Sequence, residues 1–175
     1  CYIEKLNSAK YLGVGVMHES CNRISAAIAT AQGRWYVCNG NKGGPSSAAW
    51  GYACDRGDHI GIAVDMDNGK FYASINGTWQ EGGDPANGVG SMYSDLRTAY
   101  PNIDWYPCVS NWQADNAGVM NFGQTPFRFT PPEGFVPLNS STIISEDTKL
   151  ITNPQEYFTQ INYTGDGNSG RQLEF

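Results

Sequence analysis

The sequence has few positive charges and no long apolar run. Its 11 lysine and arginine residues stand singly, and the formal net charge is −6. Proteins that bind nucleic acids or anionic membrane surfaces gather basic side chains against phosphates, so we expect neither kind of partner. No stretch approaches the roughly 18 apolar residues of a spanning helix, and we therefore expect no membrane insertion.

Cysteine motifs are missing as well. The five cysteines form no C-x-x-C pair and are widely spaced, at Cys1, Cys21, Cys38, Cys54 and Cys108. An odd number at such spacing argues against a disulfide framework or a zinc site. We predict small, buried residues that stay reduced.

The residue patterns of common catalytic sites are also absent. The two histidines, His18 and His59, stand in no Ser-His-Asp, Cys-His or H-E-x-x-H spacing, and no carboxylate pair sits in a diagnostic motif. We therefore predict a protein that is not an enzyme and needs no cofactor. No leader segment and no Met precede Cys1, so we expect a piece of a longer protein.

Residues 58–84 carry the clearest positive pattern. Apolar residues alternate with small or polar ones over 60–66 and again over 71–75, which is the period of a strand with one buried face. Asn68-Gly69 between these runs predicts a two-residue type I′ hairpin loop. Such a loop would set the cross-strand pairs Asp67–Lys70, Met66–Phe71, Val64–Ala73 and Ile62–Ile75, with the apolar partners on one face.

Turn signals separate further β-prone runs in the first 139 residues. Asn76-Gly77 predicts a second turn, although a two-residue loop there would place Trp79 on the opposite face from Ile75. Residues 18–34 fit either a short helix or a loop followed by a strand, and we favour the second. Further strands are expected at 1–6 and 11–16 around a turn at Asn7-Ser8, at 35–37, 106–110 and 118–122, with loops at 39–47 and 80–99. This spacing predicts an all-β fold, a two-sheet antiparallel β-sandwich.

The character of the chain changes after residue 139. Residues 140–152 are polar and are predicted to form a linker. Asn153-Pro154 has the form of a helix start, and the alternating residues 159–164 predict a strand. We interpret 153–175 as the incomplete start of a following module, a short C-terminal extension to the domain at 1–139.

Three groups of residues carry a resemblance to a known family. They are Tyr2-Ile3-Glu4 with Leu12-Gly13-Val14-Gly15; residues 57–65, 69–72 and 76–79 (GDHIGIAVD, GKFY and NGTW); and 106–110 with 120–124 and 126–127 (YPCVS, MNFGQ and PF). In combination they resemble the SPRY domain, which implies a concanavalin-like jelly roll. Residues 20–32 have no counterpart, and the first strand is cut short at Cys1.

One form of the SPRY family resembles this chain over additional residues. WQEGGDP at 79–85, PEGF at 132–135 and Leu138-Asn139 resemble the SPRY form of large tailed-bacteriophage virion proteins, and 157–167 is similar to the opening of a module that often follows it. The resemblance implies a viral structural protein: a structural or adhesive module of a tail, fibre or decoration, assembled in the bacterial host cytoplasm. Its partners would be neighbouring virion subunits, as a homo-oligomer (a trimer by analogy), and a host surface glycan or protein involved in host recognition.

Aromatic residues in the polar stretch 88–117 are the candidate ligand-binding residues: Tyr93, Tyr100, Trp105 and Trp112, with Tyr106 beside them. Exposed Tyr and Trp are favoured in recognition, and their rings suit the faces of sugars. The alternative is that they fill the end of the core beneath a long loop. A carbohydrate-binding adhesin, a protein-peptide recognition module and a depolymerase therefore stay open as alternatives to the structural module.

Asp65 and Asp67 are weak candidates for a calcium site. The EF-hand loop needs Gly at its sixth position and Glu at its twelfth, whereas here Gly69 is fifth and Asn76 is twelfth. The hairpin interpretation of 65–69 is favoured, and we predict no metal site.

Overall fold

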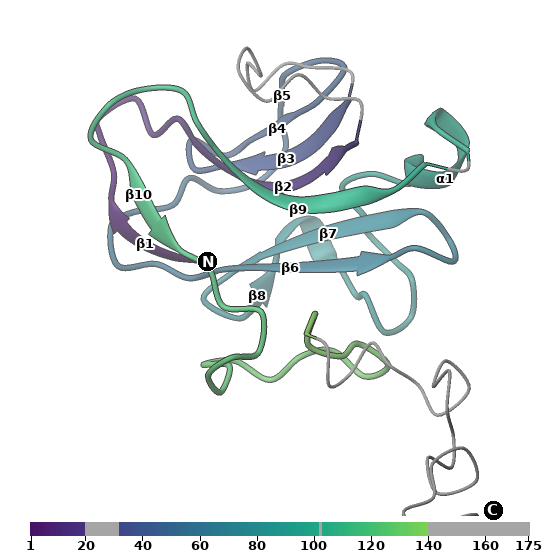
Figure 1. Cartoon of the computed structure of the whole chain (residues 1–175). Coiled ribbons are helices and arrows are strands. Elements are labelled where there is room, and N and C mark those ends of the chain that lie inside the picture. Colours follow the sequence, from purple (N-terminus) through teal and green to yellow (C-terminus); the bar gives the residue numbers. More distant parts are fainter. Residues whose placement is uncertain (20–31, 102, 140–175) are drawn as a thin grey trace, which may run out of the picture. The chain divides into compact units, whose positions relative to one another are not determined.

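The fold is described from a computed structural model, which covers residues 1–19, 32–101 and 103–139. The predictions for 20–31 and for the linker and module at 140–175 lie outside these residues. The compact unit described below runs from Cys1 to Pro137. Its regular secondary structure is almost entirely antiparallel strand, arranged in two facing layers, so the all-β sandwich is confirmed (Figure 1).

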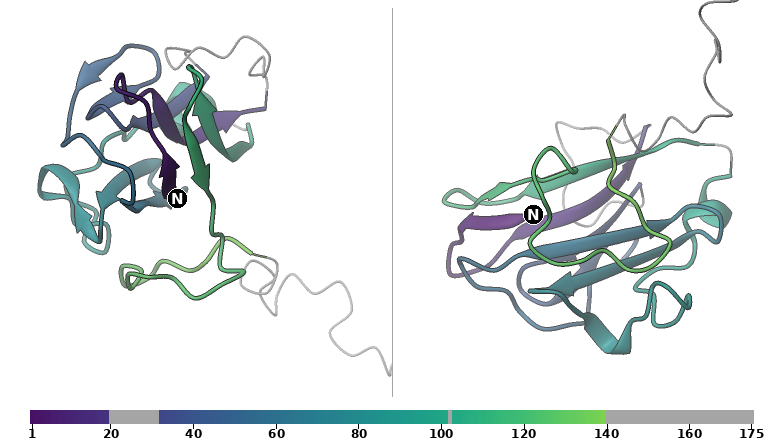
Figure 2. Two further views of the ribbon diagram at one scale, coloured as in Figure 1. Left: turned by 90° about the vertical axis from the view of Figure 1, so that its left-hand side faces the viewer. Right: turned by 90° about the horizontal axis from the view of Figure 1, so that it is seen from below.

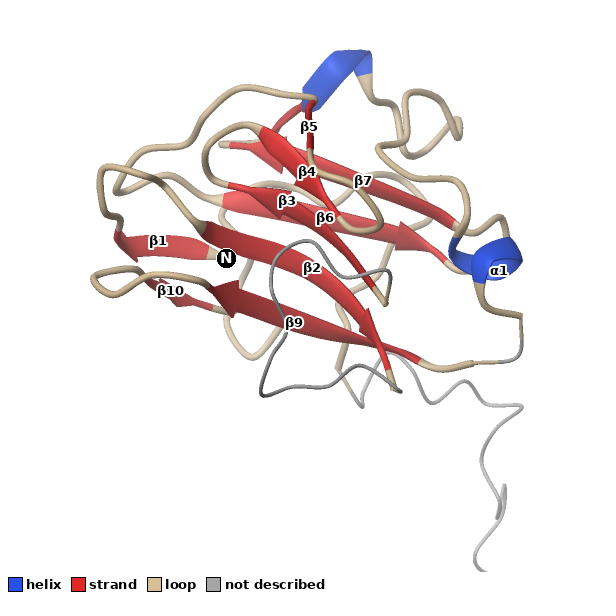
Figure 3. Cartoon of the chain, turned by 90° about the horizontal axis from the view of Figure 1, so that it is seen from above, coloured by secondary structure: helices blue, strands red, loops and turns tan. Residues whose placement is uncertain are grey.

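The first layer is a five-stranded sheet with the order β5-β4-β3-β2-β9 (Figure 3). Its strands are β2 (Leu12–His18), β3 (Gly33–Val37), β4 (Asn41–Gly43), β5 (Ala48–Ala49) and β9 (Trp105–Asn111). The expected strands at 11–16, 35–37 and 106–110 therefore form. The loop expected at 39–47 is wrong in part, because β4 pairs with β3 through Trp35–Gly43 and Tyr36–Lys42.

The second layer contains β6 (Ile60–Asp65), β7 (Lys70–Ile75) and β8 (Thr78–Trp79), together with the pair β1 (Tyr2–Lys5) and β10 (Ala117–Val119). A bridge between Tyr2 and His59 and a hydrogen bond from Ile3 N–H to Asp58 C=O (2.9 Å) join β1 to the start of β6. The strands expected on either side of Asn7-Ser8 exist, but they enter different layers instead of pairing with each other.

Helix is confined to two short pieces of the described chain. They are a 3-10 turn, η1 (Gln80–Gly82), and a single turn, α1 (Leu96–Ala99), and both lie in the long connection from β8 to β9. No helix in the described ranges has the length and apolar character needed to cross a bilayer.

The core lies between the two layers. Alternation on β2 directs Leu12, Val14 and Val16 inward, where they meet Ile60 and Phe71 of the opposite layer. Leu96 and Met92, from the long connection, close one end of this core. Burial of these apolar side chains is the main stabilising contribution to such a fold.

The β6–β7 hairpin differs in register from the sequence prediction. Asp65 pairs with Lys70 and Val64 with Phe71, two residues away from the predicted partners, so the loop spans 66–69. The Asp65 carboxylate accepts hydrogen bonds from the Asn68 backbone N–H (3.0 Å) and side-chain amide (2.7 Å), and only Gly69 has a positive φ, 67°. These bonds favour a four-residue loop over the type I′ turn. A shift of two keeps each side chain on its predicted face, but Met66 becomes exposed.

The Asn76-Gly77 turn forms as a two-residue loop. Ile75 pairs with Thr78, and Ser74 pairs with Trp79, so Trp79 does lie on the face opposite Ile75. Both central residues have positive φ, 49° and 81°, as a type I′ turn requires.

Strand β9 is the outer edge of its sheet within the described residues. The His18 N–H donates to Gln32 C=O, and the Cys38 N–H donates to Leu12 C=O, so the even-numbered residues of β2 direct their backbone groups toward β3. Pro107 pairs with Val16, one of these residues. The backbone nitrogen of Pro107 therefore points away from β2, toward the open edge.

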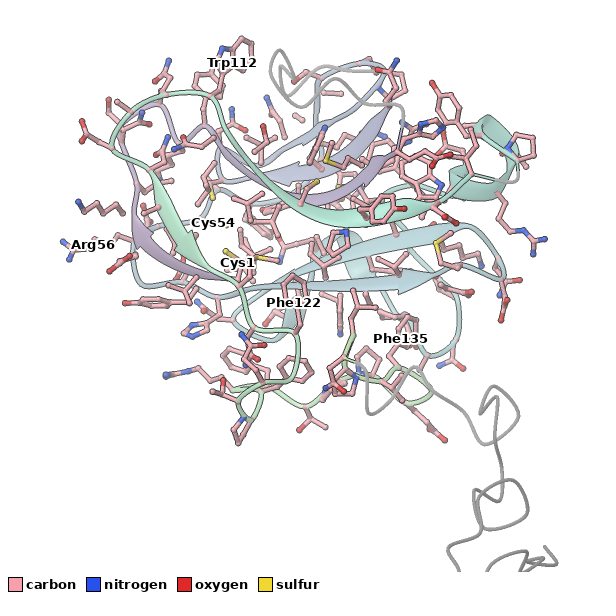
Figure 4. All side chains as sticks on the ribbon, viewed as in Figure 1. Cys1, Cys54, Arg56, Trp112, Phe122 and Phe135 are labelled. Atoms are coloured by element: carbon pink, nitrogen blue, oxygen red, sulfur yellow. The ribbon has the colours of Figure 1, made fainter. Side chains whose placement is uncertain are left out.

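Residues 120–137 have no regular strand or helix and run along the outer side of the β6–β7–β8 sheet (Figure 2). Phe122 and Phe135 lie on this side of the sheet (Figure 4). The Phe129 ring packs against Gly77, where a Cβ would come within 2.7 Å of it. This segment therefore covers part of a sheet face that would otherwise be open.

Candidate functional site

Three of the four predicted binding residues meet at one end of the core, around Arg34 of β3. The Arg34 guanidinium lies 5.2 Å from the ring centre of Tyr93 and 5.7 Å from that of Trp105. Tyr100 completes the group through His18, with ring centres 4.3 Å apart. The Trp105 indole N–H donates to Leu96 C=O (3.0 Å), and the Tyr93 hydroxyl donates to Gly43 C=O (3.0 Å).

An ion pair between the buried Arg34 and the half-buried Asp95 holds this cluster together. Arg34 is 1% exposed, and its Nε and Nη2 donate to the two carboxylate oxygens of Asp95, at 3.0 and 2.7 Å. The bidentate geometry suits a guanidinium that has been taken out of water. Burial, with a smaller contribution from Asp95, raises the pKa of Tyr93 to about 12, although Arg34 acts in the opposite direction. Tyr93 is therefore a neutral hydrogen-bond donor at neutral pH.

Tyr93, Tyr100 and Trp105 are half-buried in this cluster. The Tyr93 hydroxyl binds a backbone carbonyl of β4 and the Trp105 indole binds one of the long 80–99 connection, so the cluster fixes that connection to the end of the sandwich. Such an arrangement positions a loop, and it leaves little of each ring for a ligand.

Trp112 lies elsewhere, on the loop from β9 to β10, and points into solvent (Figure 4). It is 57% exposed, and its ring packs at 5.5 Å from that of Tyr11. The backbone N–H of Trp112 donates to the backbone C=O of Tyr11 (3.3 Å). The structure therefore does not bring Trp112 together with the other three predicted residues.

Amide side chains fix the Trp112 loop. Asn116 is buried, and its Oδ1 accepts from the Asn7 N–H (2.8 Å) while its Nδ2 donates to Asn111 Oδ1 and to Gln113 C=O (3.1 Å each). The Asn7 side chain adds a bond to Gln113 Oε1 (3.0 Å). An exposed Trp on a loop held in this way has little conformational entropy to lose on binding.

A second exposed aromatic surface, the outer strip, crosses the second layer. It consists of Val119 on β10, Tyr2 on β1, His59 before β6, and Phe129. Tyr2 pairs with Val119, the Tyr2 and His59 ring centres are 5.0 Å apart, and those of His59 and Phe129 are 5.9 Å apart. Tyr2, Val119 and Phe129 are 40%, 55% and 38% exposed.

Sequence reasoning missed the outer strip. The alternation of Tyr2 with Ile3 already indicated that Tyr2 points away from the core. No sequence signal indicated that β1 lies beside residue 59, because that neighbourhood depends on the pairing of segments about 57 residues apart.

His59 is neutral on this surface at neutral pH. Burial lowers the pKa of His59, and the positive charge of Arg128 lowers it further. The strip is consequently aromatic and uncharged, with Arg128 close to Phe129 at 5.9 Å.

The candidate calcium residues are used in the hairpin loop. The hydrogen bonds from Asn68 lower the pKa of Asp65, whose carboxylate they satisfy, and the Asp67 backbone C=O accepts from Arg97 (2.8 Å). Within the described residues, no three His, Cys, Asp or Glu side chains come together as a metal site would require.

Comparisons with known proteins give limited similarity. No family model matches the sequence, and no curated protein matches it. Among solved structures, the chain is similar to the SPRY domain of human HERC1, with 22% sequence identity and a TM-score of 0.48. The match covers 62% of this chain and 61% of that chain.

Proposed function

We propose that this chain is a non-enzymatic β-sandwich module that associates with a second copy of itself through the outer strip. The observation that carries the proposal is the continuous exposed surface of Val119, Tyr2, His59 and Phe129. Aromatic side chains with a polar tip are enriched in protein interfaces and among the residues that dominate their affinity.

The charges around the strip favour a copy of the same chain as the partner. Arg128 lies beside Phe129 at one end, and Glu4, two residues after Tyr2 in the chain, is exposed on β1. In a two-fold contact each patch meets its own counterpart, so Arg128 of one copy can face Glu4 of the other. Such complementary charges would offset part of the repulsion between two chains of net charge −6.

The finer proposal is a structural or adhesive module of a tailed-phage virion protein, located in the particle. It is supported by the sequence resemblance at 57–85 and 120–139. Mass spectrometry of purified particles of a phage that encodes this chain would detect its peptides. Their absence from particles, with the chain present in the infected cell, would refute the virion location and leave the self-association proposal standing.

Self-association is tested by sedimentation equilibrium of the chain and of the double variant Tyr2→Ala/Phe129→Ala. We expect the double variant to weaken self-association by 30-fold or more, since truncating two central interface residues removes about 2 kcal/mol or more. Tyr52→Ala is the matched control, because Tyr52 is 75% exposed on a different loop. A parent chain that stays monomeric, or a double variant that associates as well as the control, would refute the proposal.

A second candidate function is glycan binding by Trp112. It is favoured by the exposure of Trp112 and by the amide network that fixes its loop. An exposed indole offers a flat face to a sugar ring. On a glycan array, Trp112→Ala should lose binding that Tyr52→Ala retains, whereas equal binding by both variants would exclude this site. Release of sugar from host capsule would point to the depolymerase alternative instead.

A further inference from the structure

Cys38 and Cys54 bring two thiols together from separate parts of the chain. Cys38 follows the last residue of β3, and Cys54 lies in the loop 51–58 that precedes β6. Both are fully buried in the core, and neither is disulfide-bonded.

Cys54 is the buried residue of a largely exposed loop. Its neighbours Ala53 and Asp55 are exposed, as is Arg56, which points outward while Cys54 points inward (Figure 4). Tyr52 is 75% exposed. Cys54 is therefore the residue through which this loop enters the core, while backbone hydrogen bonds such as those of Tyr52 with Gln80 and of Gly57 with Ile3 also join the loop to the domain.

The backbones of the two cysteines are in direct contact. The Cys54 N–H donates to Cys38 C=O at 2.7 Å, and the Cys38 N–H donates to Leu12 C=O at 2.8 Å. The hydrogen bond between them places Cys54 directly beside Cys38. The neighbouring Cys54 thiol and burial raise the pKa of the Cys38 thiol.

We propose that Cys38 and Cys54 form a disulfide bond when the chain folds under oxidising conditions. The thiols lose two protons and two electrons as one S–S bond forms between their sulfur atoms. A low-molecular-weight disulfide such as oxidised glutathione takes up both electrons and both protons, its own S–S bond breaks, and two thiols are released.

Access of the oxidant determines when the bond forms. Thiolates attack disulfides, and a buried thiol with a raised pKa supplies few of them. The folded, reduced chain is consequently slow to oxidise, and the bond forms during folding or when the loop 51–58 opens. Once formed, it closes residues 39–53 into a covalent loop and holds Tyr52 in place on the surface.

The test uses the full chain with Cys1, Cys21 and Cys108 replaced by Ser, so that only the two thiols of interest remain. The protein is unfolded and refolded in a glutathione redox buffer, and its linked peptides are mapped without reduction. We expect the Cys38–Cys54 peptide as the main product. Because the bond closes a loop of about 15 residues, Tm should rise by about 5–10 °C, and dithiothreitol should reverse the rise.

Cys38→Ala in the same background is the matched control, and its Tm should not respond to the redox buffer. Mapping of the unsubstituted chain, refolded in the same way, provides a second measurement if the triple replacement disturbs folding. The proposal is overturned if both thiols remain free after refolding, if Cys38 or Cys54 pairs with another cysteine in the unsubstituted chain, or if the linked protein has no higher Tm.

Discussion

Gly15 lies where β2 approaches β3 so closely that no side chain fits between them. A Cβ built on Gly15 would lie 2.0 Å from the Arg34 carbonyl oxygen and 2.8 Å from the Trp35 Cα. These are backbone atoms, so they cannot move aside without a shift of the strand. Gly13, two residues earlier on the same face, has its nearest neighbour at 3.6 Å, an ordinary contact.

We expect Gly15→Ala to lower the free energy of unfolding by about 3 kcal/mol or more, because the methyl group must displace β3. Gly13→Ala, the matched control, should change it by less than about 1 kcal/mol. Urea unfolding followed by circular dichroism measures both. If Gly15→Ala and Gly13→Ala change the free energy of unfolding equally, β2 and β3 can move apart without a loss of stability.

The Arg34–Asp95 pair provides a second test at the residue scale. Asp95→Asn leaves the shape of the side chain but removes the charge opposite a fully buried guanidinium. Since Asp95 is itself partly exposed, we expect a loss of about 2–3 kcal/mol in the free energy of unfolding. Asp104→Asn, at an exposed carboxylate, is the control, and its effect should be below about 0.5 kcal/mol.

At the scale of elements, the two turns of the β6–β7–β8 meander depend on different chemistry. The Asn76-Gly77 turn follows the type I′ pattern that the sequence predicts. The 66–69 loop does not, because the Asp65 carboxylate binds Asn68 and makes a longer loop favourable. An Asn-Gly pair therefore predicts that a turn exists, and a carboxylate three residues before it can still change the register.

The variants Gly77→Ala and Gly82→Ala separate the cost of backbone strain from the cost of a clash with the Phe129 ring. Both glycines have positive φ, 81° and 67°, so both variants lose about 1 kcal/mol from backbone strain. Only Gly77 faces the Phe129 ring, whereas nothing lies within 4 Å of a Cβ on Gly82. Gly77→Ala should therefore cost at least about 1 kcal/mol more in thermal or urea unfolding, and equal losses would mean that residues 120–137 do not pack on the sheet as described.

At the scale of the whole molecule, buried phenols limit stability at high pH. Burial raises the pKa of Tyr36, Tyr72 and Tyr93, the last to about 12. An unfolded Tyr ionises near pH 10, so the folded state is at no disadvantage below that pH and loses stability as the pH rises from about 10 through 12.

Tyr93→Phe removes one of these ionisations and should flatten the loss of stability between about pH 10 and 12. At neutral pH the same variant should be less stable by about 1 kcal/mol, because the hydrogen bond to Gly43 is lost. Tyr52→Phe, at an exposed phenol, is the control. If the free energy of unfolding of Tyr93→Phe falls with pH as steeply as that of the parent between about pH 10 and 12, ionisation of Tyr93 does not cause the loss.

The sequence supports prediction of the local elements better than of their neighbours. Alternation identified β6 and β7 and the faces they bury, because side-chain direction is a local property of a strand. β-prone runs between turn signals identified β2 and β9. The outer strip and the Arg34 cluster could not be predicted, since each joins segments that are distant in the chain. Among the predicted binding residues, composition indicated Trp112 and Trp105 equally. Only the structure shows that Trp112 is exposed and that Trp105 is half-buried beside Arg34 and His18.

Pro107 lies on β9, the strand at the outer edge of the larger sheet within the described residues. Its nitrogen faces the open edge of β9 and carries no hydrogen, so a further strand laid along that edge would meet a gap in the row of donors and the bulk of the ring. Copies of this chain crowded together can touch through side chains, but extension of one another's sheet at this edge is disfavoured. A single imino acid thereby protects the protein from growing into fibres at this edge.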